Sequence, residues 1–191
     1  MEITDKTGVD KANGGKKEQG AKTKRTPTRR IALYGLLVAL ALILSYVESL
    51  VPAFFAVPGM KLGLTNVVVL VALYTMDEKS AISINVLRIL LVSFLFGNGV
   101  SFLYSLAGGV LSGLIMILLK KTGSFRMVTV SIAGGIAHNV GQILMAMAIL
   151  ETTALAYYLL ILWFSGMASG IVIGIISAET AKRVRILTKN V

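Results

Sequence analysis

The stretch from Val128 to Leu150, VTVSIAGGIAHNVGQILMAMAIL, contains no charged residue. A helix needs about 20 consecutive apolar residues to cross the hydrocarbon core of a bilayer, so this stretch predicts a membrane-spanning helix. Three polar residues, His138, Asn139 and Gln142, lie in its middle. Polar side chains inside a membrane are costly and often functional. The stretch therefore predicts a membrane protein with a hydrogen-bonding site inside it.

The composition of the whole chain agrees with a membrane protein. Apolar residues make up 55% of the 191 residues, charged residues make up 15%, and the mean hydropathy is +0.81, whereas soluble domains carry about 25% charged residues. The chain has no cysteine and one histidine, so we expect no disulfide and no metal site. No residue demands a cofactor, and none is expected. The net charge of +10 does not indicate nucleic-acid binding, because the basic residues flank apolar segments.

Six apolar segments follow one another, each near the length of a membrane span. They cover residues 31–50, 62–76, 80–97, 99–119, 127–150 and 154–180. Basic residues gather before the first segment, after the sixth, and in the connections after the second and fourth, so the positive-inside rule places both termini in the cytoplasm. We predict an all-α membrane protein with six transmembrane helices over residues 30–182. Residues 1–29 should form a disordered basic cytoplasmic tail, and residues 183–191 a short basic one.

The connection between the first two segments, residues 51–61, is apolar for a solvated loop. It contains Pro52, Pro58 and Gly59, which prevent a continuous helix. We expect it to fold back against the outer side of the bundle. There it would serve either as a lid over a binding site or as a simple interfacial turn, and the sequence favours neither.

Small residues at four-residue spacing recur in several segments and allow helices to approach closely. Packing inside the bundle explains most of these stripes. In the first segment, however, Ala32, Gly35 and Ala39 follow directly on the basic pair Arg29 and Arg30. This face is a candidate surface for docking a helix of another protein.

Arg88 is the strongest candidate for a binding residue. It lies well inside the third segment, where an ionisable side chain costs several kcal/mol and needs an explanation. Asn85 lies one helical turn earlier, on the same face. On the fifth segment, Asn139 and Gln142 present donors and acceptors together, and His138 is the weakest of the three polar residues there.

Further polar residues lie toward the outer half of the predicted bundle, so a polar cavity should open outward. They are Glu48, Lys61, Asn66 and Asn98. The alternative is that all these groups only satisfy one another, with Glu48 paired to Lys61 and Asn139 bridging two helices. Polar groups on four helices exceed what packing of a bundle requires, so we favour the binding site.

Catalysis by this chain alone is not expected. The carboxylates after the basic tail are Glu48, Asp77, Glu78, Glu151 and Glu179, and none are clustered within the membrane segments. The chain has no phosphate loop and no nucleophile with a neighbouring base. These absences favour a binding protein over an enzyme.

Four motifs occur in order along the chain: PGMKLGLTN at 58–66, LRIL at 87–90, SLAGG at 105–109 followed by Ser112, and AHNVGQ at 137–142. With these motifs the chain resembles the bacterial heptaprenyl diphosphate synthase component I family, also called the Gx transporter family. The resemblance covers about residues 29–180. It implies an isoprenoid link and a multi-pass location in the bacterial plasma membrane. The chain lacks the aspartate-rich motifs of catalytic prenyltransferases, so the name does not imply catalysis here.

The same six-span plan is similar to the S components of energy-coupling-factor (ECF) transporters, which bind vitamins. This resemblance implies that Ala32, Gly35 and Ala39 dock on a transmembrane T component that works with ATPases, and that residues 51–61 cover the substrate. The expected function is to bind a small amphipathic ligand, isoprenoid- or quinone-related, and to move it or present it to partners. Arg88 would hold the anionic or carbonyl end of that ligand.

Two alternative functions come from the family resemblance. In the first, the chain is a non-catalytic membrane subunit of heptaprenyl diphosphate or menaquinone synthesis, and its partner is a soluble prenyltransferase. In the second, it is a membrane scaffold of flavin-based extracellular electron transfer, and its partner is an extracytoplasmic flavoprotein. Membrane lipid surrounds the protein in every case, and no nucleic acid is expected.

Overall fold

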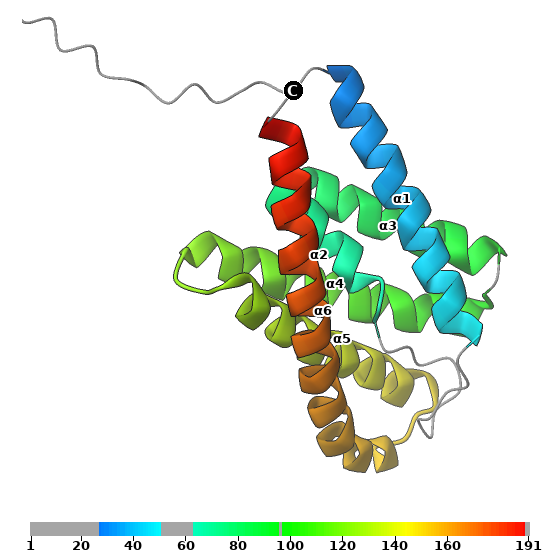
Figure 1. Ribbon diagram of the computed structural model, residues 1–191. Coiled ribbons are helices and arrows are strands. Elements are labelled where there is room, and N and C mark those ends of the chain that lie inside the picture. The colour runs from blue at the N-terminus through cyan, green and yellow to red at the C-terminus, as the bar shows by residue number, and fades with distance from the viewer. Residues whose placement is uncertain (1–26, 51–62, 96, 190–191) are drawn as a thin grey trace, which may run out of the picture.

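The computed structural model describes residues 27–50, 63–95 and 97–189. Every regular element in these ranges is a helix (Figure 1). In chain order they are α1 (Pro27–Leu50), α2 (Asn66–Thr75), α3 (Glu78–Leu95), α4 (Gly99–Thr122), α5 (Met127–Ile149), a short 3-10 helix η1 (Ala154–Tyr158) and α6 (Leu159–Lys189). Most of the tail predicted over residues 1–29 lies outside the described residues. The connection 51–61 lies entirely outside them.

Four of the described segments are long and apolar enough to cross a membrane, and they are Thr28–Leu50, Gly99–Thr122, Met127–Ile149 and Ala154–Ile186. Helix α2 has 10 residues, which rise only about 15 Å, or half the hydrocarbon core of a bilayer. Helix α3 carries three charged residues, Glu78, Lys79 and Arg88. The expected all-α membrane architecture is confirmed, whereas six crossings and two cytoplasmic termini stay predictions.

The short helix α2 forms the core of the protein. Its sequence NVVVLVALYT is apolar all round, and such a helix is stable only when other elements surround it. It contacts every other α-helix, and Val68, Leu70, Val71 and Ala72 are at most 1% exposed. Figure 1 shows α2 in the interior between α1, α3 and α6.

Glycines bring α4, α5 and α6 into close contact. A Cβ atom added to Gly141 of α5 would lie 2.7 Å from the carbonyl oxygen of Ala107 in α4, and one added to Gly170 of α6 would lie 2.6 Å from the Cα of Ile132 in α5. Both distances are shorter than real Cβ contacts. The small-residue stripes on these helices are therefore used for internal packing.

The charged residues flanking the apolar segments gather at one end of the molecule. The Arg30 guanidinium of α1 pairs with Asp77 before α3, and Lys121 of α4 pairs with Glu78 at 3.1 Å. Arg185 of α6 donates to the carbonyl oxygen of Tyr74 in α2 at 2.8 Å. The beginning of α1 and the end of α6 lie at this same end (Figure 1). Helix α6 continues to Lys189, through most of the basic tail that the sequence predicts.

Candidate functional site

Glu48 anchors the beginning of α2 to the end of α1. Its Oε1 accepts a hydrogen bond from the amide of Gly63 and another, of 3.2 Å, from the amide of Leu64. Gly63 has a φ of +81°, which glycine adopts without steric cost. The buried carboxylate also complements the positive end of the α2 dipole. Lys61, the partner expected from the sequence, lies outside the described residues.

Buried hydroxyl and amide groups continue this polar region into the bundle. The hydroxyls of Ser45 and Thr65 lie 2.9 Å apart, and Nδ2 of Asn66 donates to Oγ of Ser112 at 3.4 Å. All four side chains are buried. These bonds join α1, α2 and α4 just inside the turn that Glu48 holds.

His138 and Gln142 face the same region from α5. Their Nε2 atoms lie 3.1 Å apart, one helical turn along the helix, and both side chains are buried. A Cβ added to Gly63 would lie 3.2 Å from Nδ2 of Asn66 and 3.3 Å from Cδ2 of His138. The structure thus brings Asn66 and His138 together around the glycine that Glu48 binds.

Asn139 lies on a different side of α5. Its Nδ2 donates a 2.8 Å hydrogen bond to the carbonyl oxygen of Leu162 in α6, and a Cβ added to Gly166 would lie 3.0 Å from the same nitrogen. This is the bridge between helices that the sequence left open as an alternative. Asn139 therefore has a packing partner on α6, while Gln142 contacts His138.

Asn98 is exposed and caps α4. Its side-chain oxygen accepts a 2.8 Å hydrogen bond from the amide of Ser101, which is the usual bond of an N-cap asparagine. The cap accounts for an asparagine at this position.

Arg88 and Asn85 form a second buried polar group on α3. Arg88 is 4% exposed and Asn85 6%. The Nδ2 of Asn85 donates to the carbonyl oxygen of Gly109 in α4 at 3.0 Å, and its Oδ1 accepts from Nε of Arg88 at 3.1 Å. Among the described residues, nothing accepts a hydrogen bond from Nη2 of Arg88.

The two polar groups lie on either side of the α4 backbone. A Cβ added to Gly108 would lie 2.8 Å from the carbonyl oxygen of His138, whereas one added to the next residue, Gly109, would lie 3.3 Å from Nδ2 of Asn85. Consecutive glycines thus let α5 and α3 approach α4 from two directions, so that a buried polar group lies on each side of α4.

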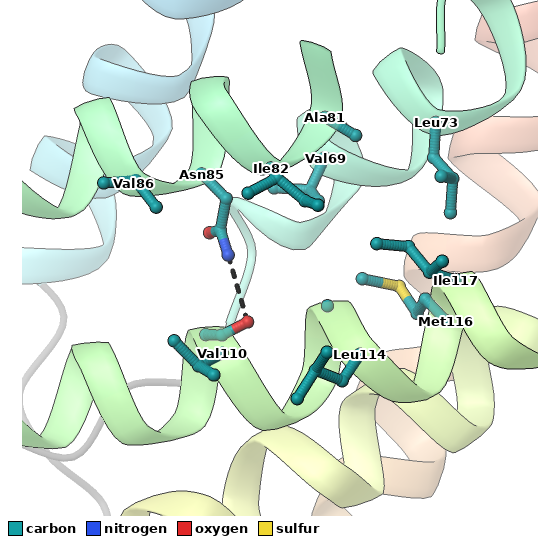
Figure 2. A pocket seen from close by; sticks show the side chains of 12 residues that line it. Val69, Leu73, Ala81, Ile82, Asn85, Val86, Val110, Leu114, Met116 and Ile117 are labelled. Atoms are coloured by element: carbon teal, nitrogen blue, oxygen red, sulfur yellow. Dashed lines mark hydrogen bonds between the residues drawn. The ribbon is translucent and has the colours of Figure 1, made fainter. Parts of the chain in front are cut away.

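An apolar cleft of about 100 Å³ lies beside this region, between α3 and α4 with α2 behind it. Figure 2 shows Asn85 pointing across from α3 toward α4, while aliphatic side chains of α2, α3 and α4 surround the rest of the space. Among the described residues that line the cleft, Asn85 alone has a side chain with a nitrogen or oxygen atom. The amide that holds Arg88 therefore forms a polar end to an otherwise apolar cleft.

The small residues Ala32, Gly35 and Ala39 of α1 are all exposed. A Cβ added to Gly35 would meet nothing within 4 Å. Large apolar side chains beside them are exposed as well, with Ile31 at 72% and Leu36 at 65%. Unlike the glycines of α4 to α6, this face is not used for packing within the described residues.

A comparison with protein families identifies the family to which the chain belongs. The family model described as heptaprenyl diphosphate synthase component I matches residues 37–180. The chain belongs to this family. Nothing among the curated proteins or the solved structures matches the chain.

The range matched by the family model contains both polar groups and the α3–α4 cleft. In the part of the chain that the structure describes, no three His, Cys, Asp or Glu side chains are placed to hold a metal ion. The groups that the structure offers are a guanidinium, amides, an imidazole and hydroxyls, which bind ligands by hydrogen bonds and charge.

Sequence reasoning missed the small and hydroxylated members of the site. Ser45, Thr65 and Ser112 contribute hydroxyls, and Gly63 and Gly108 let backbones approach the polar side chains. Serine and threonine are common in apolar helices, so single residues give little signal. A useful signal was that Ser112 lies one helical turn after the Gly108–Gly109 pair, on the face it shares with Gly108.

Proposed function

We propose that the protein is a membrane-embedded binding component, similar in plan to ECF S components. It takes up a small amphipathic ligand, isoprenoid- or quinone-related, and moves it or presents it to a partner. Arg88 binds the anionic or carbonyl end of this ligand. Asn85 positions Arg88, and Asn66, His138 and Gln142 form the polar wall, with Glu48 beside it. Lys61, which the sequence predicts in this site, lies outside the described residues.

The unused hydrogen-bonding capacity of Arg88 carries this proposal. Burying a guanidinium is costly unless it is paired and hydrogen-bonded, yet Arg88 is 4% exposed and its Nη2 has no partner among the described residues. A guanidinium presents a planar set of donors that matches phosphate, carboxylate or carbonyl oxygens. The hydrogen bond from Arg88 to Asn85 fixes this side chain before a ligand arrives. Asn139 and Asn98 have structural partners, and the proposal does not depend on them.

Ligand binding by Arg88→Gln tests the proposal. The protein would be purified gently in nanodiscs and its bound ligand identified and quantified by native mass spectrometry. Hydrogen bonds to charged groups contribute about 1.5–3 kcal/mol. We therefore expect the association constant of the ligand to fall roughly 10- to 100-fold. Arg183→Gln is a matched control, because it also removes one positive charge. Arg183 is exposed and pairs with Glu179 at 3.1 Å. Wild-type occupancy in a folded Arg88→Gln protein would refute the proposal.

A second function is favoured by the family description, which names a component of a prenyl diphosphate synthase. In this case the protein is a non-catalytic membrane subunit that anchors or activates a soluble partner. Co-purification separates the two functions. A transmembrane coupling protein with ATPases supports the binding and transport component, whereas a soluble aspartate-rich prenyltransferase supports the accessory subunit.

A further inference from the structure

The cleft between α3 and α4 opens on the outside of the bundle. Its rim is formed by side chains that are between 39% and 53% exposed, namely Ile82, Val86, Val110 and Leu114. Helix α4 is long and apolar enough to cross the membrane, so this rim faces the hydrocarbon of the bilayer. A molecule that fits the cleft reaches it from the lipid.

Gly113 keeps the cleft open on the α4 side. A Cβ added there would lie 3.8 Å from Nδ2 of Asn85, which is an ordinary contact distance, so a methyl group fits and a larger side chain would fill the space. Gly109, one turn earlier, binds the Asn85 amide through its carbonyl oxygen at 3.0 Å. Asn85 therefore separates the apolar space from Arg88, whose Nε lies 3.1 Å from the other end of the same amide.

We propose that the α3–α4 cleft holds the hydrocarbon chain of a single-chain amphiphile whose anionic head group enters at the Asn85 end and binds Arg88 when the Asn85 amide releases the carbonyl of Gly109. The ligand then reaches the site sideways from the bilayer. This inference rests on the proposed function, because it assumes that Arg88 binds the head group. A cavity of about 100 Å³ is smaller than the roughly 150 Å³ cavity that accommodates benzene. The cleft thus takes a segment of one chain, while the rest of that chain lies along the exposed rim in the lipid.

Photolabelling of the full chain in phosphatidylcholine nanodiscs tests this inference. The probe is dodecyl phosphate with a diazirine in the middle of its chain, and the labelled residues are mapped by mass spectrometry. We expect labels on the cleft residues of α3 and α4 that excess unlabelled dodecyl phosphate removes. Gly113→Leu should reduce this labelling about tenfold, the loss expected when two methylene groups are excluded from an apolar site. Gly113→Ala should give a smaller loss in a protein that folds normally.

Three controls separate the possible failures. Gly35→Leu adds the same side chain on the open face of α1 and should leave labelling unchanged. Arg88→Gln should reduce labelling by dodecyl phosphate but not by the corresponding diazirine dodecanol, whereas Gly113→Leu should reduce both. Loss in Arg88→Gln without loss in Gly113→Leu would overturn the cleft and leave the proposed function standing. If dodecyl phosphate labels Arg88→Gln as strongly as wild type, Arg88 does not bind the head group and the proposed function is overturned. Labels spread evenly over all exposed helix faces would show annular lipid only and overturn the cleft.

Discussion

Lys120 of α4 donates a 2.7 Å hydrogen bond from Nζ to the carbonyl oxygen of Leu73, in the last turn of α2. Arg185 of α6 binds the next carbonyl, that of Tyr74, at 2.8 Å. The last carbonyls of a helix have no partner within the helix, and cations stabilise its negative end. Side chains from two neighbouring helices thus bind the carbonyl oxygens at the end of α2.

Lys120→Met should lower stability, because it removes this hydrogen bond while keeping a side chain of similar length. It also removes the ammonium that lies 5.7 Å from the centre of the Tyr74 ring. We expect a loss of about 1–2 kcal/mol, measured by thermal unfolding in detergent micelles. Lys121→Met is the control, since the ion pair of Lys121 with Glu78 is exposed and such pairs contribute about 0–1 kcal/mol. Equal losses in the two variants would contradict the role assigned to Lys120.

Asp77 should make stability depend on pH at the acidic end of the range. Burial alone would raise the pKa of this carboxyl, but hydrogen bonds from Ser80 and the charge and hydrogen bond of Arg30 together lower it below the ordinary value of 3.8. A lowered folded-state pKa means that the carboxylate contributes stability above pH 3.8 and loses it as the pH falls through the lower folded value.

The comparison of wild type with Asp77→Asn checks this pH dependence. The difference between their midpoint temperatures should be constant above about pH 5 and shrink below pH 3.8. Arg30→Met, which leaves Asp77 in place, should show a smaller acid-induced loss than wild type. A difference that stays constant down to pH 2 would contradict the prediction.

The sequence predicts the helices well because membrane spans depend on the length and apolarity of local segments. The helices of the described residues follow the predicted segments to within a few residues, except at the two ends of α6. The burial of α2 could not be predicted, since an apolar segment of this kind reads equally as a short span or as a core helix. The sequence placed Asn85 on the same face as Arg88, one helical turn away, and their side chains form a hydrogen bond. It grouped Gln142 with Asn139, whereas Gln142 contacts His138 and Asn139 contacts α6.

Contacts between helices could not be predicted in this way. The direction of the Asn139 amide depends on how α5 is rotated against α6, and the contact of Glu48 with Gly63 depends on a turn outside the helices. Both depend on tertiary packing, which a single sequence does not contain.

Glu48→Ala should destabilise the turn before α2. It leaves the buried amide of Gly63 and the amide of Leu64 without their acceptor, and an unsatisfied buried donor costs about 1–3 kcal/mol. Glu48→Gln keeps an oxygen acceptor, so its loss of stability should be less than half that of Glu48→Ala. Hydrogen exchange at the amides of residues 63–66 would report the change locally. Equal exchange in wild type and Glu48→Ala would show that the carboxylate does not hold this turn.

Gly141→Ala and Gly35→Ala should have very different effects on stability, although the substitution is the same. The new methyl group at 141 would lie 2.7 Å from a backbone oxygen of α4, whereas the one at 35 would meet nothing within 4 Å. Forcing α4 and α5 apart should cost about 1–3 kcal/mol. Gly35→Ala should be neutral or stabilising by up to about 1 kcal/mol, from the better helix propensity of alanine. Thermal unfolding of both variants gives the comparison directly, and a similar loss in both would contradict the packing described for α5.

Ala39→Leu should abolish partner binding without affecting the fold, if the exposed small-residue face of α1 docks a helix of another protein. Ala39 and Gly35 are exposed, so a leucine has space in the isolated protein but would hold an approaching helix away from the α1 backbone. Ala168→Leu is the control, because Ala168 is also an exposed alanine, on α6. Each variant would be expressed with an affinity tag in the native membrane, and its co-purifying proteins quantified by mass spectrometry. We expect the partner to be lost with Ala39→Leu and kept with Ala168→Leu, at equal yields of folded protein. A partner kept by both variants would exclude this face as the docking surface, whichever of the two proposed functions holds.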